Sequence, residues 1–109
     1  MSEGSGGTVP VARLAGLVEY QEGSVVSREL VRKPAGTVTV FAFDAGQGLS
    51  EHTAPFDAIV SVLEGVAEVS IDGTHHRVGA GEFIVMPAGR PHSLSAVECF
   101  KMLLVMIRE

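Results

Sequence analysis

The side chains best suited to chemistry in this chain are its four histidines, His52, His75, His76 and His92, and its single cysteine, Cys99. Imidazole changes its charge near neutral pH and binds divalent metals when neutral, so each histidine is a candidate acid, base or ligand. A catalytic metal usually needs more than two such groups, since zinc sites use three protein ligands and non-haem iron adds a carboxylate to two histidines. Cys99 has no adjacent base to activate it and is expected to be a small buried hydrophobe.

A predicted hairpin over residues 66–78, VAEVSIDGTHHRV, places two of the histidines. Asp72-Gly73 favours a two-residue turn, because both turn positions need positive φ. This register puts His76 on the apolar, inward face and His75 on the solvent face. We therefore expect His76 to be a packed, hydrogen-bonded core residue. The expected pairs are Ile71 with Thr74, Val69 with His76, Ala67 with Val78, Ser70 with His75 and Glu68 with Arg77.

The remaining sequence is typical of an all-β protein. Thirteen glycines and five prolines separate short runs of Val, Ile, Phe and Thr, which favours a sandwich or barrel of short strands. Residues 12–20 carry leucines at helical spacing and predict a short N-terminal helical turn. Strands are predicted at 24–31, 37–43, 49–54, 57–63, 66–71, 74–78, 82–86, 92–95 and 98–107.

The length of 109 residues indicates one domain. Residues 1–10 are rich in glycine and serine and are predicted to be a flexible segment, which leaves 11–109 as a single barrel domain. The segment 1–10 has neither a positive nor an apolar region, so no signal peptide is expected. A single cysteine allows no internal disulfide, which fits a cytoplasmic protein.

The charge pattern argues against two classes of partner. The formal net charge is −5, and no basic stretch could neutralise phosphates, so nucleic acid and anionic membrane surfaces are not expected partners. The apolar run at 102–107 is too short to span a bilayer. That run makes the last strand apolar on both faces, so its outer face needs a second layer or a second subunit. In so small a chain we favour a homodimer. The facing of Lys101 and of Cys99 stays open.

Two motifs resemble those of the cupin superfamily, the small double-stranded β-helix or jelly-roll barrels. In the first motif a glycine precedes a pair of histidines and a glutamate, and a second glycine ends it; Gly46, His52 and Gly65 match. The second motif matches at Gly81, Pro87, Gly89 and His92, with Ala96 where the family has asparagine. The resemblance extends over nearly all of residues 24–107 and implies a jelly-roll barrel of the type 2 cupin kind.

The resemblance also implies a divalent metal, which in cupins is held by three histidines and a glutamate. His52 and His92 match two of these ligands, whereas Ala54 and Ala58 occupy the places of the other histidine and the glutamate. The metal implied is zinc, iron, manganese or nickel, which the sequence does not distinguish. The ligand set in this chain is incomplete.

Strand alternation tests which residues could complete the set. Asp57 and Glu51 are adjacent to inward positions and should point away unless a bulge re-aims them. Ser50 should share the face of the first-motif histidine, Gln47 lies on the loop that precedes this strand, and His76 is inward in the hairpin register. Gln47 and His76 are therefore the weak additional candidates for metal ligands.

The two alanines also predict a wider and less polar cavity than a complete metal site would leave, which suits a small organic ligand. The predicted pocket residues are Ser50, Ala54, Ala58, Val60, Leu94 and Ala96. Three functions stay open. One is a small-molecule-binding barrel with His52 and His92 as polar anchors. Another is a metal-dependent enzyme of the cupin oxygenase or isomerase type, and the third is a structural or interaction barrel. The missing carboxylate favours the first over the second.

Overall fold

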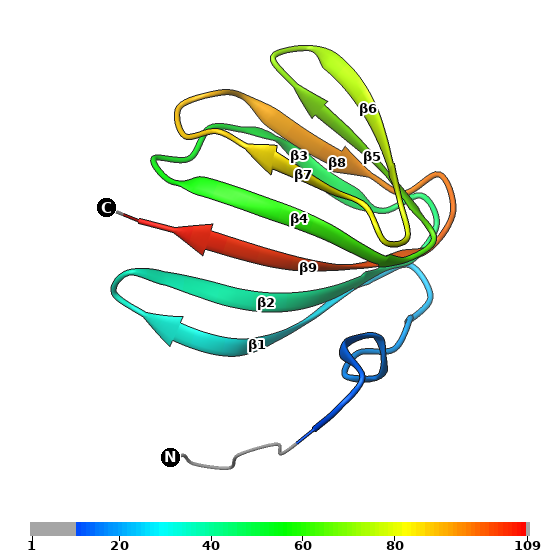
Figure 1. Ribbon diagram of the computed structural model, residues 1–109. Coiled ribbons are helices and arrows are strands. Elements are labelled where there is room, and N and C mark those ends of the chain that lie inside the picture. Colours follow the sequence, from blue (N-terminus) through cyan, green and yellow to red (C-terminus); the bar gives the residue numbers. More distant parts are fainter. Residues whose placement is uncertain (1–10, 109) are drawn as a thin grey trace.

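The structure, a computed structural model, describes residues 11–108 and is built almost entirely of β-strands (Figure 1). The predicted flexible segment 1–10 lies outside the described residues. Each predicted strand overlaps an observed one, with ends that differ by about two residues or fewer. The elements are η1 (Leu14–Gly16), β1 (Val25–Lys33), β2 (Gly36–Phe43), β3 (Gly48–His52), β4 (Asp57–Glu64), β5 (Val66–Ile71), β6 (Thr74–Gly79), β7 (Phe83–Met86), β8 (His92–Ser95) and β9 (Phe100–Ile107).

The strands form two antiparallel sheets, as the all-β prediction required. One sheet has the order β1-β2-β9-β4-β7 and the other has the order β3-β8-β5-β6 (Figure 1). Consecutive strands β3 and β4 belong to different sheets, as do β7 and β8, so the chain crosses between the layers. This arrangement confirms the jelly-roll type of barrel, and the predicted helical turn is the single 3-10 turn η1.

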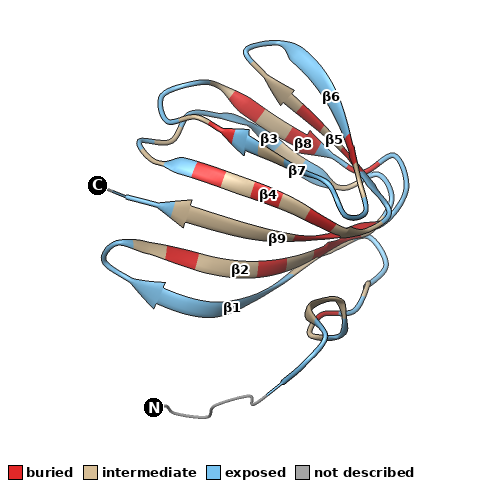
Figure 2. Cartoon of the chain, viewed as in Figure 1, coloured by how far each residue is buried: buried red, intermediate tan, exposed pale blue. Residues whose placement is uncertain are grey.

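The main core lies between the two sheets and consists of the inward side chains of both. β4 alternates buried and partly buried residues along most of its length, whereas β1 is mostly exposed (Figure 2). The rings of Phe43 and Phe100 stack at 4.6 Å between centroids and close one region of this core. The other fully buried large side chains of this core are Met102, Val60, Val62 and Val69, whereas Val40 is fully buried on the outer side of the five-stranded sheet.

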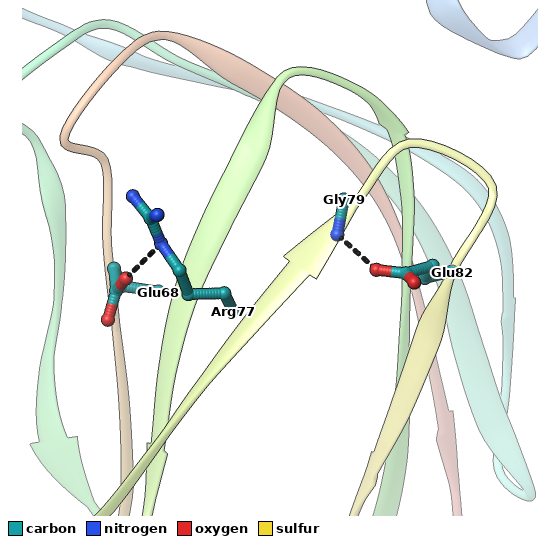
Figure 3. Close-up of polar contacts among 4 residues, drawn as sticks. All are labelled: Glu68, Arg77, Gly79 and Glu82. Atoms are coloured by element: carbon teal, nitrogen blue, oxygen red, sulfur yellow. Dashed lines mark hydrogen bonds and ion pairs between the residues drawn. The ribbon is translucent and has the colours of Figure 1, made fainter.

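The β5–β6 hairpin has the predicted turn and register. Asp72 and Gly73 have φ values of 51° and 79°, and all the expected residue pairs are observed. Arg77 Nε donates to Glu68 Oε2 at 2.9 Å across the outer face (Figure 3). In the next turn the Gly79 backbone N–H donates to Glu82 Oε1 at 2.8 Å, which fixes the path from β6 to β7 (Figure 3).

The predicted burial of His76 is wrong. Its strand position is as expected, on the same face as the buried Val78, but its side chain is exposed. The reason is that β6 is the edge strand of its sheet. Among the described residues β6 has a neighbouring strand on one side only, so a side chain nearer the hairpin turn, such as His76, is open to solvent at the sheet edge.

Residues 14–20 cover part of the outer face of the five-stranded sheet. Val18 packs there with Val40 and Ala42 of β2 and with Leu103 of β9. Part of the second layer that β9 needs therefore comes from the same chain. Among residues 11–108, no helix is long and apolar enough to cross a membrane.

Lys101 faces outward beneath this N-terminal segment and not into the barrel. Its Nζ donates to the carbonyl oxygen of Ala15 at 2.6 Å and lies 5.0 Å from the ring centroid of Tyr20. The Tyr20 hydroxyl in turn donates to Glu64 Oε2 at 2.7 Å. Burial and the neighbouring Glu64 carboxylate both raise the pKa of Tyr20. Cys99 is exposed, so its expected burial is wrong.

Candidate functional site

The pairing of β3 with β8 brings His52, at the end of β3, next to His92, at the start of β8. These residues are Cα partners across the β3–β8 pair. Their Nε2 atoms lie 3.1 Å apart, and their rings meet edge to face at 76° with 4.4 Å between centroids. His92 is only 4% exposed, whereas His52 is exposed to solvent on one side.

Backbone carbonyls fix the same tautomer in both rings. His52 Nδ1 lies 2.8 Å from the carbonyl oxygen of Ser50, and His92 Nδ1 lies 3.1 Å from that of Arg90. A carbonyl oxygen only accepts, so each Nδ1 carries a hydrogen and donates it. In the neutral rings both Nε2 atoms therefore present lone pairs, and the two lone pairs face each other across 3.1 Å. The pair is thus a preformed acceptor for a proton, a ligand's hydrogen-bond donor or a cation.

The environment of His92 favours its neutral form. Burial lowers the pKa of His92 below its ordinary value, and the neighbouring His52 lowers it further, whereas the bond to the Arg90 carbonyl acts in the opposite direction. His92 is accordingly a neutral hydrogen-bond acceptor at physiological pH.

A small internal cavity of about 110 Å³ lies against this histidine pair. Among the described residues that line it, only His52 and His92 have polar side chains. The lining residues are Leu49, His52, Ala54, Phe56, Ala58, Met86, His92, Leu94, Met102, Leu104 and Met106. The site is therefore an apolar chamber with one polar feature.

The predicted pocket residues fall into two groups. Ala54, Ala58 and Leu94 line the chamber, whereas Val60 and Ala96 are buried in the surrounding core without lining it. Ser50 was expected to share the face of His52, but it does not line the chamber, whereas Leu49 and His52 both do. The register of β3 shifts between Leu49 and His52, and this irregularity breaks the alternation on which the expectation depended.

The two weak candidates for further metal ligands lie away from the histidine pair. Gln47 does not line the chamber, and its backbone carbonyl accepts from the Ala96 N–H at 2.8 Å. His76 lies in a separate shallow groove with Asp72 and Arg90. Within residues 11–108, no three His, Cys, Asp or Glu side chains gather closely enough to hold a metal ion. The protein residues present thus provide two converging nitrogens and do not match a resident divalent ion with three or more protein ligands.

Sequence reasoning did not identify the other residues that line the chamber. Met102, Leu104 and Met106 alternate along β9, so strand parity could have placed them on one face once the inward side was known. Met86 ends β7, opposite Ala58 in the register. Phe56 belongs to the segment between β3 and β4, where no periodicity applies, and nothing in the sequence indicated its role.

Comparison with known proteins assigns the family. A family profile described as Cupin domain matches residues 39–107. The chain is similar to a solved conserved protein of unknown function from Streptococcus pyogenes, with 43% identity, a TM-score of 0.90 and coverage of 94% of this chain and 90% of that one. It is also similar to a cupin 2 conserved barrel domain protein from Leptotrichia buccalis, with 44% identity, a TM-score of 0.84 and coverage of 86% of this chain but only 46% of that one.

More distant structures share the fold alone. A variant of the salicylate 1,2-dioxygenase from Pseudoaminobacter salicylatoxidans is 19% identical, with a TM-score of 0.70 over 76% of this chain and 26% of that one. No functionally curated protein matches the sequence. The profile match covers more than half of the chain and agrees with the two-sheet barrel and the positions of His52 and His92, so the protein belongs to the cupin superfamily, as a type 2 cupin.

Proposed function

We propose that the protein binds a small, mostly apolar molecule inside the barrel, with His52 and His92 as the polar anchor. The observation that carries the proposal is the chamber itself, in which two imidazole acceptors face a wall of alanine, leucine, methionine and phenylalanine side chains. Apolar pockets with a few convergent polar groups are typical of small-molecule sites. A hydroxyl or N–H of the ligand would donate to the Nε2 lone pairs and replace their mutual repulsion with hydrogen bonds.

The size of the chamber limits the ligand. A volume of about 110 Å³ is well below the roughly 300–1,000 Å³ of pockets for drug-sized ligands. It is also somewhat below the engineered apolar cavity of about 150 Å³ that holds benzene. The portion of a ligand inside the chamber is therefore no larger than a single small ring or a short branched chain. Three methionines, Met86, Met102 and Met106, line the chamber, and their flexible side chains allow its shape to adjust to a ligand.

Binding without turnover fits the lining better than catalysis does. Among the described lining residues there is no carboxylate, lysine, cysteine or hydroxyl nucleophile. Any acid or base chemistry would depend on the two histidines. Burial lowers the pKa of His92, so this residue is a poor proton donor near neutral pH because little of it is protonated.

Isothermal titration with phenol tests this function, because phenol combines a small apolar ring with one hydroxyl donor. We expect phenol to bind in a one-to-one complex and Ala58→Leu to abolish binding, since the larger side chain fills the chamber. Ile59→Leu is the matched control, because it lies on the same strand but outside the chamber lining and should bind phenol like the natural chain. A folded protein that binds no small apolar probe would contradict the proposal and favour a purely structural barrel.

A two-histidine metal site is the second candidate, and the 3.1 Å convergence of the Nε2 atoms is the observation that favours it. Solvent or a bound ligand would have to supply the remaining coordination positions. Elemental analysis of protein purified without chelators separates the two candidates. The main proposal expects well below one equivalent of zinc, iron, manganese or nickel. One equivalent that is lost in both His52→Ala and His92→Ala would instead establish the metal site.

A further inference from the structure

A second and larger hollow adjoins the chamber, and the two share one wall. Phe56 lines the internal cavity of about 110 Å³ and also an outer groove of about 550 Å³. No other described residue lines both. Phe56 is thus the residue at which the histidine chamber and the outer groove meet at this end of the barrel.

The outer groove is built where three parts of the chain meet. These are the segment between β3 and β4, the segment between β7 and β8, and the carboxyl end of β9, which lie together on the left in Figure 1. The Gly89 N–H donates to the carbonyl oxygen of Ala54 at 2.8 Å, and the Ala88 N–H donates to Asp57 Oδ1 at 2.8 Å. These bonds hold the two connecting segments to each other, so the groove has a defined rim.

Arg108 is the one cation among the described residues that line this groove. Its guanidinium carbon lies 5.3 Å from the centroid of the Phe56 ring, within the range of a cation–π contact. Among the described residues it makes no ion pair at 4 Å or less. The other charged lining residue is Asp57, which already accepts the bond from Ala88. The Arg108 guanidinium therefore places a positive charge next to Phe56, on a chain whose net charge is −5.

From this arrangement we infer that the ligand is a small organic acid. Its apolar body occupies the histidine chamber, and its carboxylate reaches past Phe56 to the guanidinium of Arg108. Arginine suits a carboxylate because its planar fork can donate two parallel hydrogen bonds. This inference rests on the proposed function, since it assigns a ligand class to the same chamber.

Matched pairs of probes isolate the contribution of the charge. Benzoate is compared with benzamide, and hexanoate with hexanamide, by titration calorimetry at low salt on the full chain. Each pair has nearly the same shape; the acid carries a negative charge, whereas the amide is neutral and has N–H donors instead. In the pair that binds more tightly, the acid should bind about fivefold better than the amide, as expected for one partly exposed charged contact. This advantage should shrink at high salt.

Variants then assign the advantage to Arg108. Arg108→Gln should bring the acid and the amide to equal affinity while leaving amide binding in place. Arg28→Gln on the exposed strand β1 removes the same charge away from both hollows and should keep the advantage. Amides that bind as tightly as acids to the natural chain would overturn the inference while leaving the proposed function intact. An advantage that survives Arg108→Gln would also overturn it. A chain that binds none of the four probes would contradict both the inference and the proposed function.

Discussion

His52 and His92 are held in the same way, each by an Nδ1–H bond to the carbonyl of the residue two positions before it in the chain. With a hydrogen on each Nδ1, both Nε2 atoms carry lone pairs in the neutral rings, and the two nitrogens lie 3.1 Å apart. A proton, a hydrogen-bond donor of a ligand or a cation between the two nitrogens would each remove the repulsion between their lone pairs. Among the described residues that line the apolar chamber, this pair provides the only polar side chains.

The lowered pKa of His92 predicts a dependence of stability on pH. As the pH falls, His92 in the unfolded chain takes up a proton near the ordinary pKa of 6.5. In the folded protein its pKa is lower, so it stays neutral until a lower pH is reached. The unfolded state thus binds more protons in this window, so the free energy of unfolding rises with pH through it and falls as the solution is acidified below about pH 6.5.

Thermal unfolding between about pH 7.5 and about pH 5 measures this dependence. His92→Gln should flatten the slope of the melting temperature in that range. His75→Gln removes an exposed histidine and should leave the slope as it is in the natural chain. Equal slopes in all three proteins would show that His92 does not resist protonation in the fold.

The hydroxyl of Thr37 predicts a stabilising substitution. Thr37 is 6% exposed, and its Oγ1 has no hydrogen-bond partner among the described residues. A buried unsatisfied polar group costs about 1–3 kcal/mol, and valine has nearly the same shape without the hydroxyl. Thr37→Val should raise the free energy of unfolding in urea by about 1 kcal/mol. Thr39→Val, at a less buried position on the same strand, is the control and should change it by about 0.5 kcal/mol or less. A loss of stability in Thr37→Val would mean that the hydroxyl has a partner in solution.

Lys101 predicts how the N-terminal segment is fastened. Its Nζ donates to the carbonyl of Ala15, so Lys101→Met keeps the aliphatic stem but leaves that carbonyl without its donor. We expect a loss of about 1–3 kcal/mol in the free energy of unfolding. Hydrogen exchange should also become faster at residues 14–20 than in the barrel strands. Lys33→Met, on the exposed strand β1, is the control and should leave exchange at 14–20 unchanged. Unchanged exchange in Lys101→Met would show that apolar packing and the Tyr20–Glu64 hydrogen bond hold the segment without Lys101.

The homodimer stays a prediction, now with a more specific surface. Residues 14–20 cover only part of the outer face, and Phe83 and Val85 of β7 lie on this face and are 66% and 44% exposed. Light scattering at micromolar concentration should give twice the chain mass, and Phe83→Asp should reduce it to the chain mass. Val97→Asp is the matched control, since Val97 is equally exposed at 66% but lies between β8 and β9, and it should remain dimeric. A monomeric natural chain would refute the prediction.

Local turn chemistry and strand alternation made much of the fold predictable. The Asp72-Gly73 pair predicted the β5–β6 register, because a two-residue hairpin turn that needs positive φ at both positions favours this sequence. Alternation failed at Ser50, where a register shift in β3 separates Leu49 from His52. It also failed to predict the exposure of His76, since residue spacing does not tell which strand lies at a sheet edge.

The candidate site was predictable only in part for a related reason. The resemblance to the cupin motifs could pair His52 with His92 and identify the two alanines that line the chamber beside them. The role of Phe56 depends on how two connecting segments meet, and the role of Arg108 depends on where β9 ends relative to them. These are properties of the assembled barrel, and no short stretch of the sequence encodes them.

A crystal structure of the protein soaked with phenol tests the central claim most directly. The account predicts ring density inside the chamber bounded by Ala58, Leu94 and Met102, with the phenol oxygen within hydrogen-bond distance of the Nε2 atoms of His52 and His92. Phenol found only on the outer surface, with the chamber filled by the protein's own side chains, would contradict it.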